Sequence, residues 1–127
     1  DSKPQWVINK VKLAVADFLQ VNSTKTAKDV TIACFGLAFK PDIDDLRESP
    51  ALEIAREIGR MHPGKVWGVE PNIHSLPNTE SFDLVKTDTA IEKSDILLLL
   101  VDHFLFKKIK HSEFCRKVVV DTRGIWS

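Results

Sequence analysis

Lys40 and Arg47 are basic residues in a short segment that is otherwise rich in carboxylates. The acids around them are Asp42, Asp44, Asp45 and Glu48. A cation that neighbouring carboxylates hold rigidly can present donors to an anion, and each charge-assisted hydrogen bond contributes about 1.5–3 kcal/mol. A solvated loop with internal ion pairs has the same composition, so spacing alone leaves both interpretations open. A divalent-metal site is disfavoured, because the segment lacks the glycine and distal glutamate of a calcium-binding hand.

Arg123 and His103 each follow an apolar run. The planar guanidinium of Arg123 suits a phosphate or a base carbonyl, and an ion pair with Asp121 or Asp102 is the competing interpretation. A lone histidine after a strand is more often a hydrogen-bonded loop residue than a catalyst. The sequence therefore offers cations for a binding site rather than a catalytic set.

Apolar runs predict the strands that position these residues. VTIACFG, KVWGVEP, DILLLLVD and KVVVDTRG are typical of buried strands in a parallel sheet, and DLVKT is a further short candidate. In such sheets ligands bind beyond the carboxyl ends of the strands, at a switch in strand order. We therefore expect a site among residues 36–47, 70–72, 102–103 and 121–124.

A long amphipathic helix is predicted at the N-terminus. Pro4 suits its first turn, and the polar residues 22–24 end it. Its apolar stripe, at spacings of four and three, consists of Val7, Val11, Ala14, Phe18 and Val21. The stripe predicts that one face of this helix is buried.

Helices are also expected between the strands. Ser49 followed by Pro50 is typical of a helix start, and an apolar face continues to Met61. A brief helix ending at Lys93 is expected to be capped by Asp88 or Thr89.

The connection 103–115 is expected to be irregular and partly helical, with Phe104 and Phe106 buried. The order of elements therefore predicts an α/β fold: a Rossmann-like open, mainly parallel sheet with flanking helices, preceded by a long N-terminal helix.

Composition excludes several classes of partner. Lys plus Arg and Asp plus Glu are 18 each, so the net charge is zero and no global field favours a nucleic acid or an anionic membrane. The longest uncharged apolar stretch, 96–101, is far shorter than the roughly 20 residues of a membrane span. The first residues lack the features of a secretory signal, so a cytoplasmic location is expected. Cys34 and Cys115 are expected to be reduced and to fill space.

Motifs for nucleotide cofactors and for nucleophilic catalysis are missing from the sequence. GLAFKP holds one glycine where a dinucleotide-binding turn requires three, although Glu70 ends the second predicted strand as an acid should. Neither a P-loop nor a serine nucleophile elbow is found. We assign no catalytic residue and no metal ligand.

The segment GLAFKPDIDDLRESPALEI resembles the signature of the UDP-binding domain of the UDP-glucose/GDP-mannose dehydrogenase family, in particular the branch that oxidises UDP-N-acetyl-D-mannosamine. VEPNIH, LLLLVDHFLF and VVVDTRG are similar to further elements of that domain. The resemblance implies that residues 1–24 end the central linking helix of the family and that residues 25–127 form its UDP-sugar-binding, Rossmann-like domain.

The resemblance also implies an activity for the parent enzyme. Family members oxidise C6 of a sugar from alcohol to acid in two NAD-dependent steps, through a thiohemiacetal and a thioester, and supply precursors of surface polysaccharides. In the family, NAD is bound mainly by an N-terminal domain. Cys34 matches no part of the motif that carries the family's catalytic cysteine, so it is not assigned that role. The fragment alone is therefore expected to be inactive, with a UDP-sugar and the rest of a homo-oligomeric parent as its partners.

Four residues take roles from the resemblance. Phe39, Lys40 and Arg123 match substrate-binding residues, with Arg123 at the nucleotide end of the substrate. Arg47 matches an arginine that reaches NAD, and Asp45 then looks like its orienting partner.

Other functions remain open at this stage. UDP-glucose or GDP-mannose is an alternative substrate within the same family. A receiver-like regulatory domain is an alternative of another class, although it needs an acidic pair where Gly36–Phe39 stand. An assembly module is a third, because the N-terminal stripe and three tryptophans could build an interface.

Overall fold

The computed structural model describes residues 2–38, 46, 49–73, 75–76 and 80–126. Its elements are α1 (Ser2–Val21), η1 (Ala27–Asp29), β1 (Ile32–Phe35), α2 (Pro50–Met61), β2 (Val66–Val69), β3 (Asp83–Leu84), α3 (Thr87–Lys93), β4 (Ile96–Leu99), α4 (Phe104–Lys107), η2 (His111–Phe114) and β5 (Val118–Asp121). The predicted strand and helix order is confirmed. Phe39, Lys40 and Arg47, together with the acids at 42, 44, 45 and 48, lie outside the described residues.

The five strands form one parallel sheet in the order β3-β2-β1-β4-β5. β1 lies at the centre, with Ile32 opposite Val66 of β2 on one side and Ile96 of β4 on the other. This is the strand order of a Rossmann fold, whereas receiver domains have the order 2-1-3-4-5. The predicted Rossmann-like sheet is therefore confirmed, and the receiver-like alternative is wrong.

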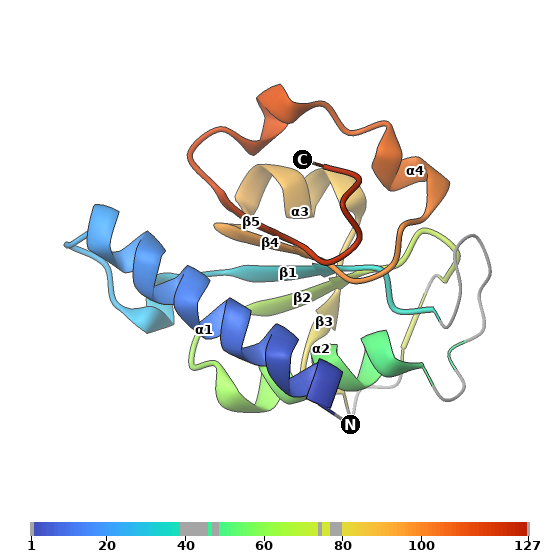
Figure 1. The fold of residues 1–127 in the computed structure, drawn as a ribbon, viewed down its shortest axis with the longest axis horizontal. Helices are drawn as coiled ribbons and strands as arrows, with labels where there is room; N and C mark the ends of the chain where they lie inside the picture. Colours follow the sequence, from blue (N-terminus) through green and yellow to red (C-terminus); the bar gives the residue numbers. More distant parts are fainter. Residues whose placement is uncertain (1, 39–45, 47–48, 74, 77–79, 127) are drawn as a thin grey trace.

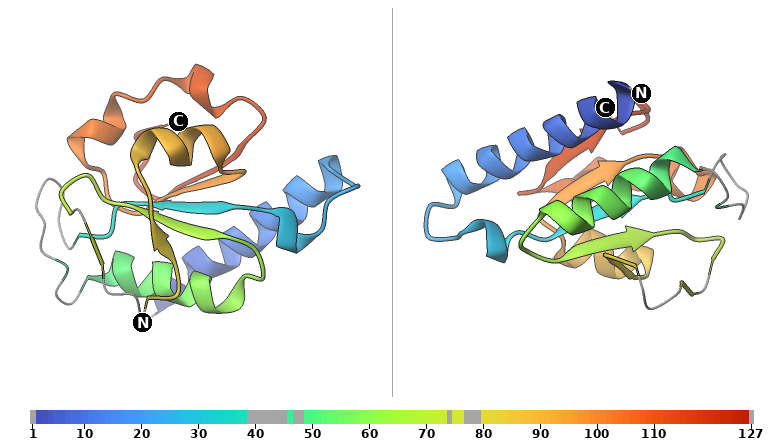
Figure 2. Two further views of the ribbon diagram at one scale, coloured as in Figure 1. Left: turned by 180° about the vertical axis from the view of Figure 1, so that it is seen from behind. Right: turned by 90° about the horizontal axis from the view of Figure 1, so that it is seen from below.

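Helices cover both faces of the sheet (Figure 1). Ile32 and Cys34 of β1 pack with α1 and α2 in one core, while Ala33 and Phe35 belong to a second core that includes Phe106 of α4. The alternation follows from the period of two in a strand. The view from behind and the view from below show the same layers (Figure 2). β1 and β4 are buried along their whole length, as their apolar sequences predict.

The long N-terminal helix is present, and its stripe is buried up to Phe18. Val21 was expected in the same stripe, but 85% of this residue is exposed. The reason is positional, because Val21 is the last residue of α1 and the chain then turns away toward η1.

Two smaller expectations about side chains are wrong. α3 begins at Thr87, with Ala90 N–H bonded to the Lys86 carbonyl, so Asp88 and Thr89 lie inside the first turn and do not cap it. Phe104 is 56% exposed because it opens α4 on the outer side, under the Lys108 ammonium; Phe106 is fully buried as expected.

The two cysteines differ in environment, and both are free thiols. Cys34 fills space in the core, as expected, whereas Cys115 is exposed, because it follows η2 at the surface. Among the described helices, none has the length and apolar character required to cross a bilayer.

Candidate functional site

All five strands end at one side of the sheet, which we call the carboxyl edge. The switch in strand order lies there between β1 and β4, where Gly36 passes close to Val101. Gly36 has a φ of +98°, and a Cβ at this position would lie 2.5 Å from the Val101 Cβ. Only glycine therefore allows the chain to leave β1 along this path.

Glu70, at the end of β2, is the most heavily hydrogen-bonded side chain of this edge. It is 3% exposed, and its Oε1 accepts the backbone N–H groups of Leu37 at 2.9 Å and Ala38 at 3.0 Å. The turn after β1 is thus fixed by a carboxylate from the neighbouring strand.

His103 and Asn72 hold the same carboxylate from two other directions. His103 Nε2 lies 2.8 Å from Oε1, and because a carboxylate only accepts, this nitrogen carries the proton. Oε2 accepts the backbone N–H of Asn72 at 3.2 Å and its Nδ2 at 3.1 Å. Burial raises the pKa of Glu70, but the bonds from His103, Leu37 and Asn72 outweigh it and hold that pKa below its usual range. The carboxylate is therefore ionised at neutral pH.

Ser49 forms hydrogen bonds to residues on both sides of the segment that carries Lys40 and Arg47. Its hydroxyl donates to the Leu37 carbonyl at 2.6 Å and accepts the Leu52 N–H at 3.2 Å, so the expected helix cap is confirmed. Ser49 is 2% exposed. Leu37 and Ser49, which lie before and after positions 39–48, are consequently anchored in the core.

Arg123 lies in the loop after β5 and is exposed. The Asp121 carboxylate shapes this loop by accepting three backbone N–H groups, those of Arg123 at 2.8 Å, Gly124 at 2.7 Å and Trp126 at 2.6 Å. Arg123 Nε donates to the Leu100 carbonyl at 3.1 Å, next to the end of β4. Within the described residues, no ion pair joins Arg123 to Asp121 or Asp102, so the ion-pair interpretation is wrong there.

The structure thus brings Arg123, His103 and Glu70 to the carboxyl edge, together with Ala38 and Ser49, which flank positions 39–48. Phe39, Lys40 and Arg47 themselves lie outside the described residues, so their predicted roles stay predictions. The sequence reasoning missed the contact between Glu70 and His103. Each was noticed as a polar residue at a strand end, and the order β2-β1-β4 is what brings them together.

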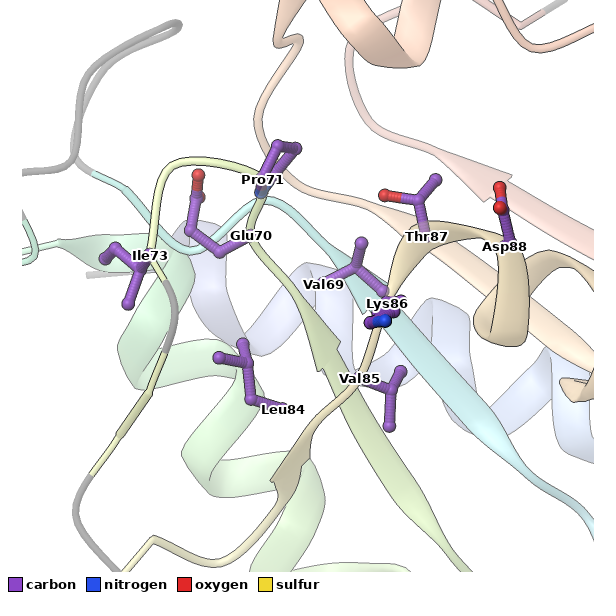
Figure 3. Close-up of a pocket in the computed structure, with 9 residues that line it drawn as sticks. All are labelled: Val69, Glu70, Pro71, Ile73, Leu84, Val85, Lys86, Thr87 and Asp88. Carbon is purple, nitrogen blue, oxygen red and sulfur yellow. The ribbon is translucent and has the colours of Figure 1, made fainter.

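A cavity of about 500 Å³ opens at the carboxyl ends of β2 and β3 (Figure 3). Its lining consists of Val69, Glu70, Pro71, Ile73, Leu84, Val85, Lys86, Thr87 and Asp88. The Glu70 carboxylate already accepts hydrogen bonds from Leu37, Ala38, Asn72 and His103. In the described part of the chain, no group of three or more His, Cys, Asp or Glu side chains could hold a metal ion.

Known proteins are similar to this chain along almost its whole length. The chain is 52% identical over 128 aligned positions to UDP-N-acetyl-D-mannosamine dehydrogenase of Yersinia pestis, covering 99% of this chain and 30% of that protein. It is 44% identical to NDP-N-acetyl-D-galactosaminuronic acid dehydrogenase of Ralstonia solanacearum, covering 100% of this chain and 28% of that protein. The chain therefore spans less than a third of the length of these relatives.

Solved structures show the same similarity. The native structure of the UDP-N-acetyl-mannosamine dehydrogenase Cap5O from Staphylococcus aureus superposes with a TM-score of 0.71 at 26% identity, covering 98% of this chain and 27% of that one. Residues 33–127 match the model of the UDP-binding domain of the UDP-glucose/GDP-mannose dehydrogenase family. Since that match spans most of the sequence, the chain belongs to the UDP-glucose/GDP-mannose dehydrogenase family.

Proposed function

We propose that the chain is the UDP-sugar-binding part of an NAD-dependent UDP-N-acetyl-D-mannosamine 6-dehydrogenase. The observation that carries the binding role is Arg123, a guanidinium whose Nε is fixed at the carboxyl edge while the residue is exposed. The choice of sugar is supported by the 52% identity to the Yersinia enzyme, against 44% for the galactosaminuronic acid enzyme. UDP-glucose and GDP-mannose are the alternative substrates.

In this proposal Phe39, Lys40 and Arg123 bind the UDP-sugar, and Arg47 contacts NAD. The parent oxidises the C6 alcohol of the sugar to the uronic acid in two steps, with NAD as hydride acceptor. The chain itself supplies no catalytic residue, so it is inactive alone. Residues 1–24 end the linking helix of the parent and residues 25–127 form the binding domain.

The turn after β1 does not fit the pyrophosphate of NAD. In dinucleotide-binding Rossmann units the amides of this turn and the following helix start bind pyrophosphate. Here the amides of Leu37 and Ala38 donate to Glu70 instead. NAD is therefore bound mainly by the remainder of the parent, which we propose to be homo-oligomeric and cytoplasmic.

Calorimetric titration of UDP into the chain tests the substrate site. We expect measurable but weak binding, because only part of the site is supplied by this chain. Arg123→Ala and Lys40→Ala should each weaken binding about tenfold or more, since each removes charge-assisted hydrogen bonds to an anion.

Arg60→Ala and Lys12→Ala are matched controls, because both remove an exposed cation from a helix outside the carboxyl edge. Both should bind UDP as the unaltered chain does. Unchanged heats in both Arg123→Ala and Lys40→Ala, or equal losses in the controls, would contradict the assignment.

A further inference from the structure

The turn after β1 contains an anion of its own. The Glu70 carboxylate accepts the N–H groups of Leu37 and Ala38 with one oxygen, at 2.9 and 3.0 Å. In nucleotide-binding Rossmann units, amides after the first strand are donors to phosphate. Here that place is occupied by a carboxylate that is 3% exposed.

Glu70 cannot turn away from these amides without losing other bonds. His103, 1% exposed, holds the same oxygen from the end of β4, and Asn72 holds the second oxygen from the turn after β2. The carboxylate therefore ties together the ends of the three adjacent strands β2, β1 and β4.

Leu37 is fixed on both sides of its backbone. Its N–H donates to Glu70, and its carbonyl accepts the Ser49 hydroxyl at 2.6 Å. The next N–H, that of Ala38, is fixed as well. The position and direction of the chain at Ala38, the last described residue before position 39, are thus set by Glu70 and Ser49 together.

We propose that Glu70 is a positioning residue: its carboxylate closes the turn amides to an external phosphate and fixes the chain at Leu37 and Ala38, the residues that directly precede Phe39 and Lys40 in the sequence. Its effect on UDP affinity rests on the proposed function. Its effect on the turn does not, since the bonds from Leu37 and Ala38 to Glu70 form without a ligand.

Amide hydrogen exchange followed by NMR tests the turn without any ligand. In Glu70→Ala, the Leu37 and Ala38 amides should exchange about tenfold faster or more, because their buried acceptor is gone. Glu70→Gln keeps an acceptor oxygen in the place of Oε1. Its exchange rates at Leu37 and Ala38 should therefore lie between those of Glu70→Ala and those of the unaltered chain. If Glu70→Ala does not fold, Glu70→Gln still gives the measurement.

Asp95→Asn is a matched control at the opposite edge of the sheet. The Asp95 carboxylate accepts the Thr31 N–H at 2.9 Å, just before β1, so it also binds a backbone amide next to the same strand. Its substitution should affect Thr31 and leave the exchange of Leu37 and Ala38 unchanged.

UDP affinity and its rescue by a small carboxylate test the positioning role. Glu70→Ala should weaken UDP binding about tenfold, and added formate should restore part of the lost affinity by occupying the vacated place between the amides. Chloride at equal ionic strength should not restore the UDP affinity. A residue that only stabilised the fold would give no such anion-specific recovery.

The outcomes separate the two claims. If the unaltered chain does not bind UDP, the proposed function fails, and the exchange of Leu37 and Ala38 still decides whether Glu70 orders the turn. If both Glu70 variants keep Leu37 and Ala38 protected and bind UDP within twofold of the unaltered chain, the role of Glu70 is overturned. Loss of protection with loss of UDP affinity and recovery in formate supports it.

Discussion

Carboxylates at the carboxyl edge act mainly on backbone N–H groups. Asp121 accepts three of them and thereby shapes the loop of Arg123, and Glu70 accepts those of Leu37, Ala38 and Asn72. A buried donor without an acceptor costs about 1–3 kcal/mol, so Glu70, which accepts the buried N–H groups of Leu37 and Ala38, has a large effect on local structure. Neutralising one such group should therefore be visible in stability.

Glu70 should make the free energy of unfolding depend on pH under acidic conditions. Its folded pKa lies below the usual value of 4.5, so the unfolded chain binds the proton at higher pH than the folded chain does. The stabilisation is complete above about pH 4.5 and is lost as pH falls through the folded pKa. Glu70→Gln should be less stable at neutral pH and should lose less stability on acidification, as measured by urea unfolding between about pH 3 and pH 7. An unchanged slope would contradict this interpretation.

The two thiols should differ in reactivity. Burial raises the pKa of Cys34 to about 12, whereas Cys115 is exposed. With a thiol-specific disulfide reagent near pH 8, Cys115 should react quickly and Cys34 only on unfolding. Cys115→Ser should abolish the fast reaction and Cys34→Ser should leave it intact. Fast labelling of Cys34 in the folded Cys115→Ser variant would disprove the buried assignment.

At the scale of elements, the end of β1 is the point on which the site depends. Gly36 turns the chain out of the sheet at a φ of +98°, against the backbone of Val101, and its N–H bonds to the Val69 carbonyl at 2.8 Å. β1 thus contacts both β2 and β4 at the position where it leaves the sheet. A side chain at this position would separate the strands.

Gly36→Ala should destabilise the chain by about 3 kcal/mol or more, since it combines backbone strain with overpacking against Val101. Gly124→Ala is the matched control: Gly124 has a φ of +76°, but nothing lies within 4 Å of a Cβ there. Its cost should be only about 1–2 kcal/mol, from the backbone alone. Urea unfolding of both variants measures the difference, and equal losses would exclude the close approach as the cause.

Local pattern predicted the elements well because most of them are decided locally. The run from Ile96 to Leu99 is a buried strand, and Ser49 caps α2, as their sequences indicate. The errors occur where the position of a residue in the fold decides its burial. Val21 is apolar but ends α1, and Phe104 is apolar but lies on the outer side of α4, so both are exposed. The hydrophobic pattern of a sequence indicates which residues favour burial. It does not indicate which of them have a neighbouring element that covers them.

The candidate site was predictable only in part for the same reason. Arg123 is visible in the sequence because it follows an apolar run, but its Nε is fixed by the backbone carbonyl of Leu100, just after β4. Glu70 and His103 are 33 positions apart, and their contact depends on β1 lying between β2 and β4. Strand order is a long-range property that no local spacing encodes.

On the scale of the whole molecule, the sheet separates two cores of different make-up. One core holds α1 and α2, and its buried residues are aliphatic apart from Phe18, Phe82 and Cys34. The other holds the T-shaped contacts of Phe35 with Phe106 and Trp126. α1 shares buried residues with α2 and the sheet, so it is an integral part of the first core. Its removal would expose that face of the sheet.

Phe18→Ala should lower the free energy of unfolding by about 3–5 kcal/mol, because Phe18 is 5% exposed and its loss leaves a cavity under α1. Val21→Ala, on the same helix but 85% exposed, should change it by less than about 0.5 kcal/mol. Chemical denaturation of the two variants checks the contribution of α1. A small effect of Phe18→Ala would mean that α1 is docked only loosely.

The direction of α1 has a consequence for assembly. Val21 lies toward the start of β1, so the amino end of the helix points toward the carboxyl edge (Figures 1 and 2). A polypeptide joined ahead of α1 is consequently tethered beside the candidate site rather than behind it. If such a polypeptide binds the same ligand, a short tether would hold it there at an effective concentration of about millimolar.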